Sequence, residues 1–107
     1  MDPTVKNLYD QFKNIEDNYG LLLQRCASED EKEKLRAAYT QAWRNYNQAI
    51  NKTFREDDPA VAELRAQIAL QTTEVQDALH GLQAMAKTLD TIARCVALGS
   101  KLVGAIT

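Results

Sequence analysis

The stretch 59–105 decides the fold and reads PAVAELRAQIALQTTEVQDALHGLQAMAKTLDTIARCVALGSKLVGA. Apolar or small side chains recur in it at alternating intervals of three and four residues, which is the spacing of one face of an α-helix. This seam runs for six heptads without a stutter, so it predicts helices that pack against other helices. Its positions are Val61, Leu64, Ile68, Gln71, Val75, Ala78, Leu82, Met85, Leu89, Ile92, Val96, Gly99 and Val103.

Gly81 lies near the middle of this stretch and leaves two architectures open. A turn normally needs several polar residues and interrupts the heptad, and neither happens around Gly81. A glycine inside a helix costs only about 1 kcal/mol. We therefore expect one continuous helix over about 59–105. If the chain instead turns at Gly81, four helices of similar length form a four-helix bundle.

Two further helices are predicted upstream of this stretch. A seam of the same spacing runs through about 3–26, where Asp2 followed by Pro3 is a typical helix start. A capping box that begins at Ser28 predicts the next helix over about 29–54. Because the connection between these two helices is very short, they should form an antiparallel hairpin.

The predicted fold is therefore all-α, with one domain over 1–107 built as a hairpin plus a long third helix in a coiled-coil-like three-helix bundle. Asp58 followed by Pro59 marks the start of that third helix. The chain has 107 residues with only four glycines and two prolines, and sandwiches or α/β repeats usually need more turn residues.

Composition excludes several classes of function. The net charge is -2 and gives no overall attraction to nucleic acids. No targeting signal or membrane-spanning run is visible, so we expect a cytoplasmic protein. Cys26 and Cys95 are expected to be free thiols. With a single histidine and no cluster of catalytic or metal-binding residues, we predict no enzyme activity, no metal and no cofactor.

The preferred hypothesis is a non-enzymatic protein-protein interaction or adaptor protein that forms a homodimer. A continuous third helix would overhang the hairpin and expose an apolar stripe that needs a companion. Changing Leu89 and Val96 to aspartate is then expected to leave a helical monomer. Small residues such as Ala86, Ala93 and Ala97 would also let another backbone come close. The predicted self-association or partner-binding residues are Leu82, Met85, Leu89, Ile92, Val96 and Val103.

Two alternative functions remain open at this point. Lys87, Arg94 and Lys101 recur every seven residues, so residues 82–106 resemble a basic amphipathic helix that contacts an anionic membrane surface. Three cations are few for this purpose, because polybasic lipid recognition usually takes about four to eight. The third hypothesis is a small nucleic-acid-binding subunit, and it rests only on scattered arginines.

Overall fold

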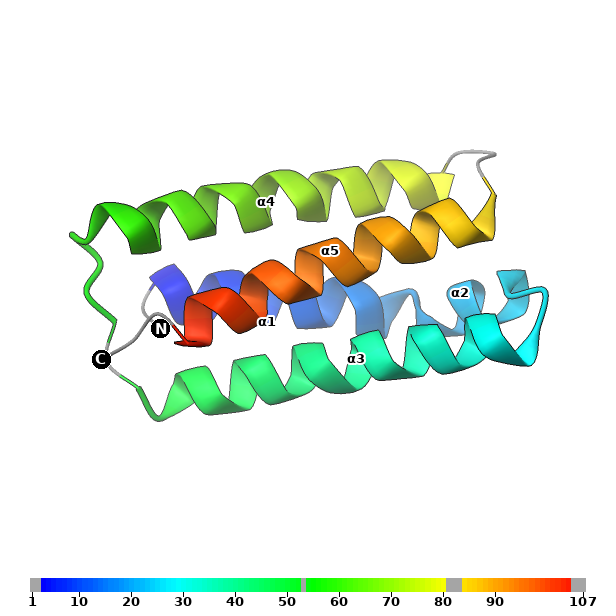
Figure 1. Cartoon of the computed structure of the whole chain (residues 1–107), viewed down its shortest axis with the longest axis horizontal. Helices are drawn as coiled ribbons and strands as arrows, with labels where there is room; N and C mark the ends of the chain where they lie inside the picture. Colours follow the sequence, from blue (N-terminus) through cyan, green and yellow to red (C-terminus); the bar gives the residue numbers. More distant parts are fainter. Residues whose placement is uncertain (1–2, 53, 81–83, 105–107) are drawn as a thin grey trace.

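Five helices make up nearly all of the described chain. The structure is a computed structural model that describes residues 3–52, 54–80 and 84–104. The helices pack lengthwise into a body of 42 × 21 × 19 Å (Figure 1). This confirms the predicted all-helical class for the described residues. The helices are α1 (Pro3–Asp17), α2 (Tyr19–Arg25), α3 (Glu29–Ile50), α4 (Pro59–His80) and α5 (Met85–Gly104).

The predicted continuous helix over 59–105 is wrong. Helix α4 ends at His80 and α5 begins at Met85, and the two helices lie side by side in opposite directions (Figure 1). Gly81 itself lies outside the described residues. This arrangement is favourable because α5 covers its apolar side with the chain's own helices, without the entropy that binding a second molecule would cost.

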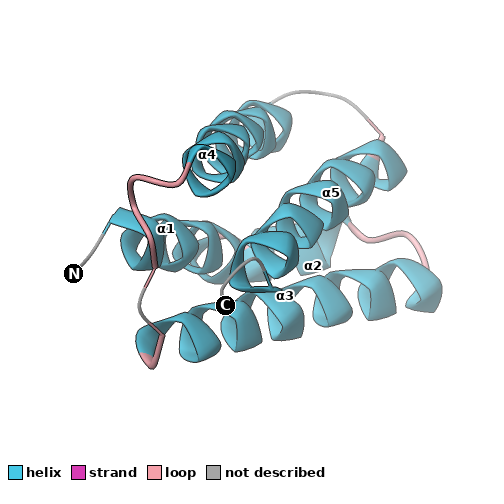
Figure 2. Cartoon of the chain, turned by 60° about the vertical axis from the view of Figure 1, so that its left-hand side comes forward, coloured by secondary structure: helices cyan, strands magenta, loops and turns pink. Residues whose placement is uncertain are grey.

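Helix α5 lies against both α3 and α4, and α1 lies against the same two helices (Figure 2). The connection between α3 and α4 therefore crosses one end of the body. In that connection the side chain of Phe54 is buried. Glu56 accepts a hydrogen bond of 2.8 Å from the Thr4 hydroxyl on α1 and forms an ion pair with Arg65 on α4. These contacts tie the connection to two helices.

Most helix starts lie where the sequence predicts them. The Ser28 hydroxyl accepts from the Glu31 backbone N–H at 3.2 Å, as expected for a capping box, and Asp58 caps α4 by accepting from the Ala60 N–H at 2.9 Å. The first predicted helix is interrupted at Asn18, where the side-chain amide donates to the Asn14 carbonyl oxygen at 2.7 Å. An asparagine side chain that bonds to backbone in this way competes with the helical pattern.

Aromatic rings fill the interface between α1 and α3. The ring centroids of Tyr9 and Tyr46 are 5.2 Å apart, and those of Phe12 and Tyr39 are 5.5 Å apart. The Tyr39 hydroxyl donates a 3.1 Å hydrogen bond to the Glu16 carboxylate. The α1 side of α3 is therefore closed by large side chains, which contrasts with its other side.

Candidate helix-binding groove

The side of α3 that faces α5 borders an open groove. The two helices run in the same direction, since Asn45 contacts Val96 and Ser100 while Lys52, just beyond the end of α3, donates to the Val103 carbonyl oxygen at 3.5 Å. The groove has a volume of about 840 Å³. Its lining residues are Glu31, Lys34, Ala37, Ala38, Gln41, Ala86, Leu89, Asp90, Ala93, Val96, Ala97, Ser100 and Lys101.

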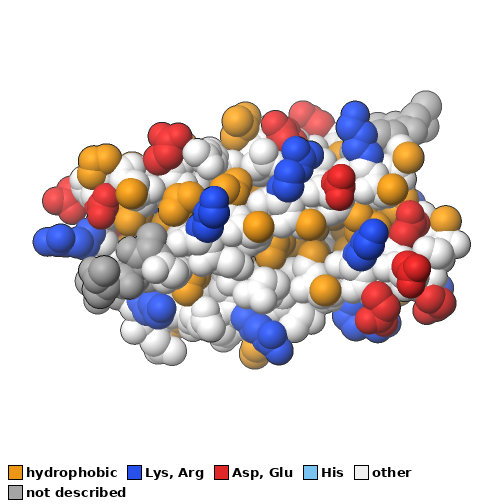
Figure 3. Space-filling view, in the orientation of Figure 1, with side chains coloured by type: hydrophobic (Ala, Val, Ile, Leu, Met, Phe, Trp, Pro, Cys, Tyr) orange, Lys and Arg blue, Asp and Glu red, His pale blue; other side chains and the backbone are white. Residues whose placement is uncertain are grey.

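The groove exists because its walls are built from small side chains. Alanine occupies five lining positions, and those at 37, 86, 93 and 97 are exposed to solvent. The larger side chains of Leu89 and Val96 form the buried floor. Figure 3 shows hydrophobic side chains along the line between α3 and α5, with charged side chains on either side. Such a surface offers apolar contact to a partner.

A buried polar cluster below the groove holds α1, α3 and α5 in register. The Gln11 amide donates to the Cys95 carbonyl oxygen at 2.7 Å, and the Asn45 amide donates to Ser100 Oγ at 3.2 Å. A side chain at Gly99 would collide with this cluster, because an added Cβ would lie 2.8 Å from Gln11 Oε1. A larger residue at this position would therefore displace the Gln11 side chain, and glycine lets the helices approach closely without that displacement.

Sequence reasoning did not predict this cluster. Gln11 and Asn45 are 2% and 1% exposed, although both are polar and lie outside the apolar seam. One usable signal was Gly99, because the other seam positions of α5 all hold large apolar residues. The cluster matters for the groove because buried polar contacts favour one helix register over others.

The six predicted self-association residues do not form an exposed stripe. Met85, Leu89, Ile92 and Val96 are all buried in the chain's own core, and so is Val103. Leu82 lies outside the described residues. These residues were expected to lack partners within the chain, and this expectation is wrong because α5 packs against both α3 and α4. Of the five described members, only Leu89 and Val96 line the groove, where they form its floor.

The three basic residues of α5 are exposed, as their spacing predicts. Lys101 lines the groove, whereas Lys87 and Arg94 do not. The apolar side of α5, which an amphipathic anchor would insert into a membrane, is buried in the core instead. Within the described part of the chain, no helix is long and apolar enough to cross a membrane.

Neither cysteine is placed for chemistry at the groove. Burial raises the pKa of the Cys95 thiol, which lies in the polar cluster, and burial also raises the pKa of Cys26. A raised pKa lowers the thiolate fraction and with it the nucleophilicity. The described residues contain no group of three or more His, Cys, Asp or Glu side chains that could hold a metal ion.

Fold and surface together define the class of this molecule as an all-helical protein with an open apolar groove between two parallel helices. Comparisons with protein-family models, with curated proteins and with solved structures found no match to the chain.

Proposed function

We propose that this chain is a non-enzymatic interaction protein that binds an amphipathic helix in the groove between α3 and α5. In this proposal the body is a four-helix bundle in which α1 and α2 together form one bent member. The observation that carries the proposal is the groove itself, which is about 840 Å³ in volume, alanine-walled and bordered by charges. This combination suits the mode of recognition in which a partner lays its apolar face into a hydrophobic groove.

The dimensions of the groove support a helical occupant. Its α5 wall extends from Ala86 to Lys101, which is about 22 Å or four turns at 1.5 Å per residue. Alanine walls let a third helix axis come close to both neighbours, as small residues do at tight helix-helix contacts. A partner helix with apolar residues at intervals of three and four would lie in the groove along this length.

The two alternative functions receive no comparable support. A membrane anchor would need α5 to leave the bundle, since its apolar side chains are core residues. Trp43 is the one exposed aromatic side chain among the described residues, and of its two sequence neighbours only Arg44 is basic. Single-stranded nucleic-acid binders combine such aromatics with a positively charged groove.

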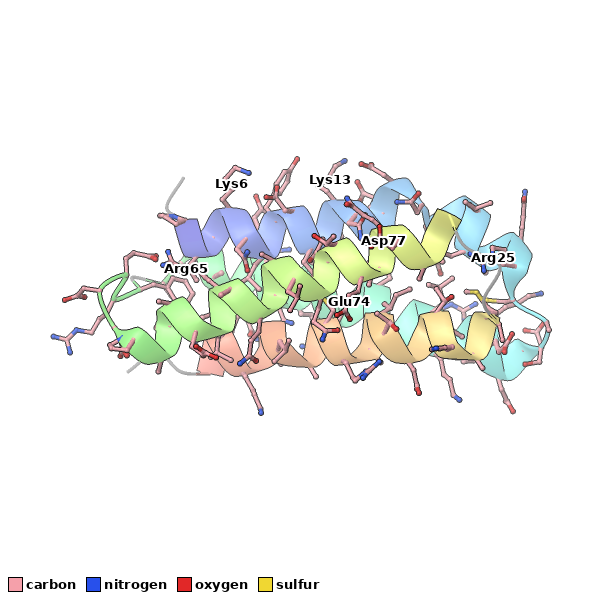
Figure 4. The ribbon with its side chains drawn as sticks, turned by 90° about the horizontal axis from the view of Figure 1, so that it is seen from above. Lys6, Lys13, Arg25, Arg65, Glu74 and Asp77 are labelled. Atoms are coloured by element: carbon pink, nitrogen blue, oxygen red, sulfur yellow. The ribbon has the colours of Figure 1, made fainter. Side chains whose placement is uncertain are left out.

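A photo-crosslinking experiment in living cells tests the proposal. A diazirine-bearing lysine analogue is introduced at Lys34 on the groove border, and at Lys6 as the matched control. Lys6 lies on the edge of the molecule opposite to α5 (Figure 4). We expect one discrete adduct from position 34 and none from position 6. The adduct should disappear in Ala93→Trp, which fills the groove from an exposed position and keeps the fold.

Either of two results would contradict the proposed groove. If positions 34 and 6 give the same adducts, or if the adduct at 34 persists in folded Ala93→Trp, the groove is not the binding site. Circular dichroism of Ala93→Trp must match that of the wild type for this comparison. The mass of the adduct then shows whether the occupant is another protein or a second copy of this chain.

A further inference from the structure

The groove carries charges that are arranged symmetrically along its length. Asp90 and Lys101 line it eleven residues apart on α5, which is about 16 Å. Ala93 and Ala97 lie between them, and the midpoint of the two charges coincides within half a residue with the midpoint of the two alanines. Within the described residues, neither charge forms an ion pair.

The α3 wall does not cancel this arrangement. Glu31 and Lys34 line the end of the groove where Asp90 lies, and their opposite charges offset each other. The other end holds Lys101 with the neutral side chains Gln41 and Ser100. One end of the groove is therefore net negative and the other net positive.

If a second copy of the groove faces the first in the opposite direction, the negative end of each groove meets the positive end of the other. A two-fold axis near position 95 would pair α5 with α5 of a second copy in antiparallel orientation. Asp90 would then face Lys101 of the second copy, and Lys101 would face Asp90 of the second copy. The alanines in between let the two helices approach closely. A two-fold contact of this kind uses the same patch on both subunits.

We infer that the occupant of the α3–α5 groove is the same groove of a second copy of this chain, in an antiparallel two-fold dimer with two Asp90–Lys101 ion pairs. The inference rests on the proposed function, since it names the partner for that surface. A second copy matches the opposite charges at the two ends by symmetry, because each copy brings both charges of the pair.

Sedimentation velocity on charge-reversal variants tests this antiparallel register, in which Asp90 faces Lys101 of the second copy. Asp90→Lys and Lys101→Asp each place like charges together twice in the dimer, so each should raise the dissociation constant about tenfold. The double variant restores opposite pairs and should return the constant to within about twofold of the wild type. Lys87→Asp makes the same change on α5 outside the groove lining, and it should leave the constant within about twofold.

The variants are expected to fold, because positions 87, 90 and 101 are exposed. The wild type supplies a readout without any substitution: its dissociation constant should rise several-fold between about 0.05 and about 0.5 M NaCl. A wild type that stays monomeric at millimolar concentration overturns the dimer, and failure of the double variant to recover overturns the register. A Lys34 adduct to another protein would then leave the proposed function standing.

Discussion

Replacing Leu89 and Val96 together by aspartate is expected to unfold the chain. Both side chains are nearly inaccessible, with 5% and 4% exposure, and both belong to the hydrophobic core. A buried carboxylate without a partner costs several kcal/mol, and the two together rival the roughly 5–15 kcal/mol that stabilise a typical domain. Far-ultraviolet circular dichroism should show most of the helical signal lost and no cooperative thermal transition.

The matched control is a pair of aspartates on the exposed side of the same helix. Ala86→Asp with Ala93→Asp introduces the same two charges at solvent-exposed positions. This variant should retain its helical signal and a cooperative transition, because exposed substitutions usually change stability by less than about 0.5 kcal/mol each. A Leu89→Asp, Val96→Asp protein that remains helical and melts cooperatively would show that α5 is not a core helix. That result would favour the continuous, overhanging helix over about 59–105.

Substitution of Gly99 is expected to have the second-largest effect on stability. A Cβ at this position would lie 2.8 Å from Gln11 Oε1 and 3.1 Å from both Asn45 Nδ2 and Leu8 Cδ2. Gly99→Leu adds four carbons where one already collides, so it should lower the free energy of unfolding by about 3 kcal/mol or more. For Gly99→Ala the collision is partly offset by helix propensity, which is worth about 1 kcal/mol.

Gly104 is the control position for this series. It lies on the same helix, and a Cβ there would meet nothing within 4 Å. Gly104→Ala should therefore be neutral or stabilise the protein by up to about 1 kcal/mol. Urea denaturation measures all three free energies. If Gly99→Leu is as stable as the wild type, then α1, α3 and α5 do not pack closely around position 99, and this part of the structure is contradicted.

Helical class and several helix starts could be predicted from the sequence because they depend on local signals. The capping box at Ser28 and the helix start at Pro59 depend on residues only a few positions away along the chain. The continuity of the third helix depends on long-range packing instead. A heptad seam predicts equally a helix that overhangs and a helix that folds back, since both bury the same positions. Unbroken spacing around Gly81 therefore did not distinguish the two architectures.

The groove could be predicted only in part for the same reason. Small residues on α5, such as Ala93 and Ala97, indicated that another helix can come close. The identity of the helix beside these alanines depends on how α3 and α5 pack together. No local sequence pattern determines that packing. The buried positions of Gln11 and Asn45 were also unpredictable, because each side-chain amide donates to a backbone carbonyl oxygen more than 50 residues away along the chain.

A distance measurement between α4 and α5 tests the central claim, that α5 folds back along α4, most directly. Spin labels at Glu63 and Lys101, in a Cys26→Ala, Cys95→Ala background diluted with unlabelled protein, report the separation within one chain. Both positions are exposed. Adjacent helix axes are about 10 Å apart, so the labels should be less than about 30 Å apart. In a continuous helix the 38 intervening rises would separate them by about 57 Å, and that distance would contradict the account.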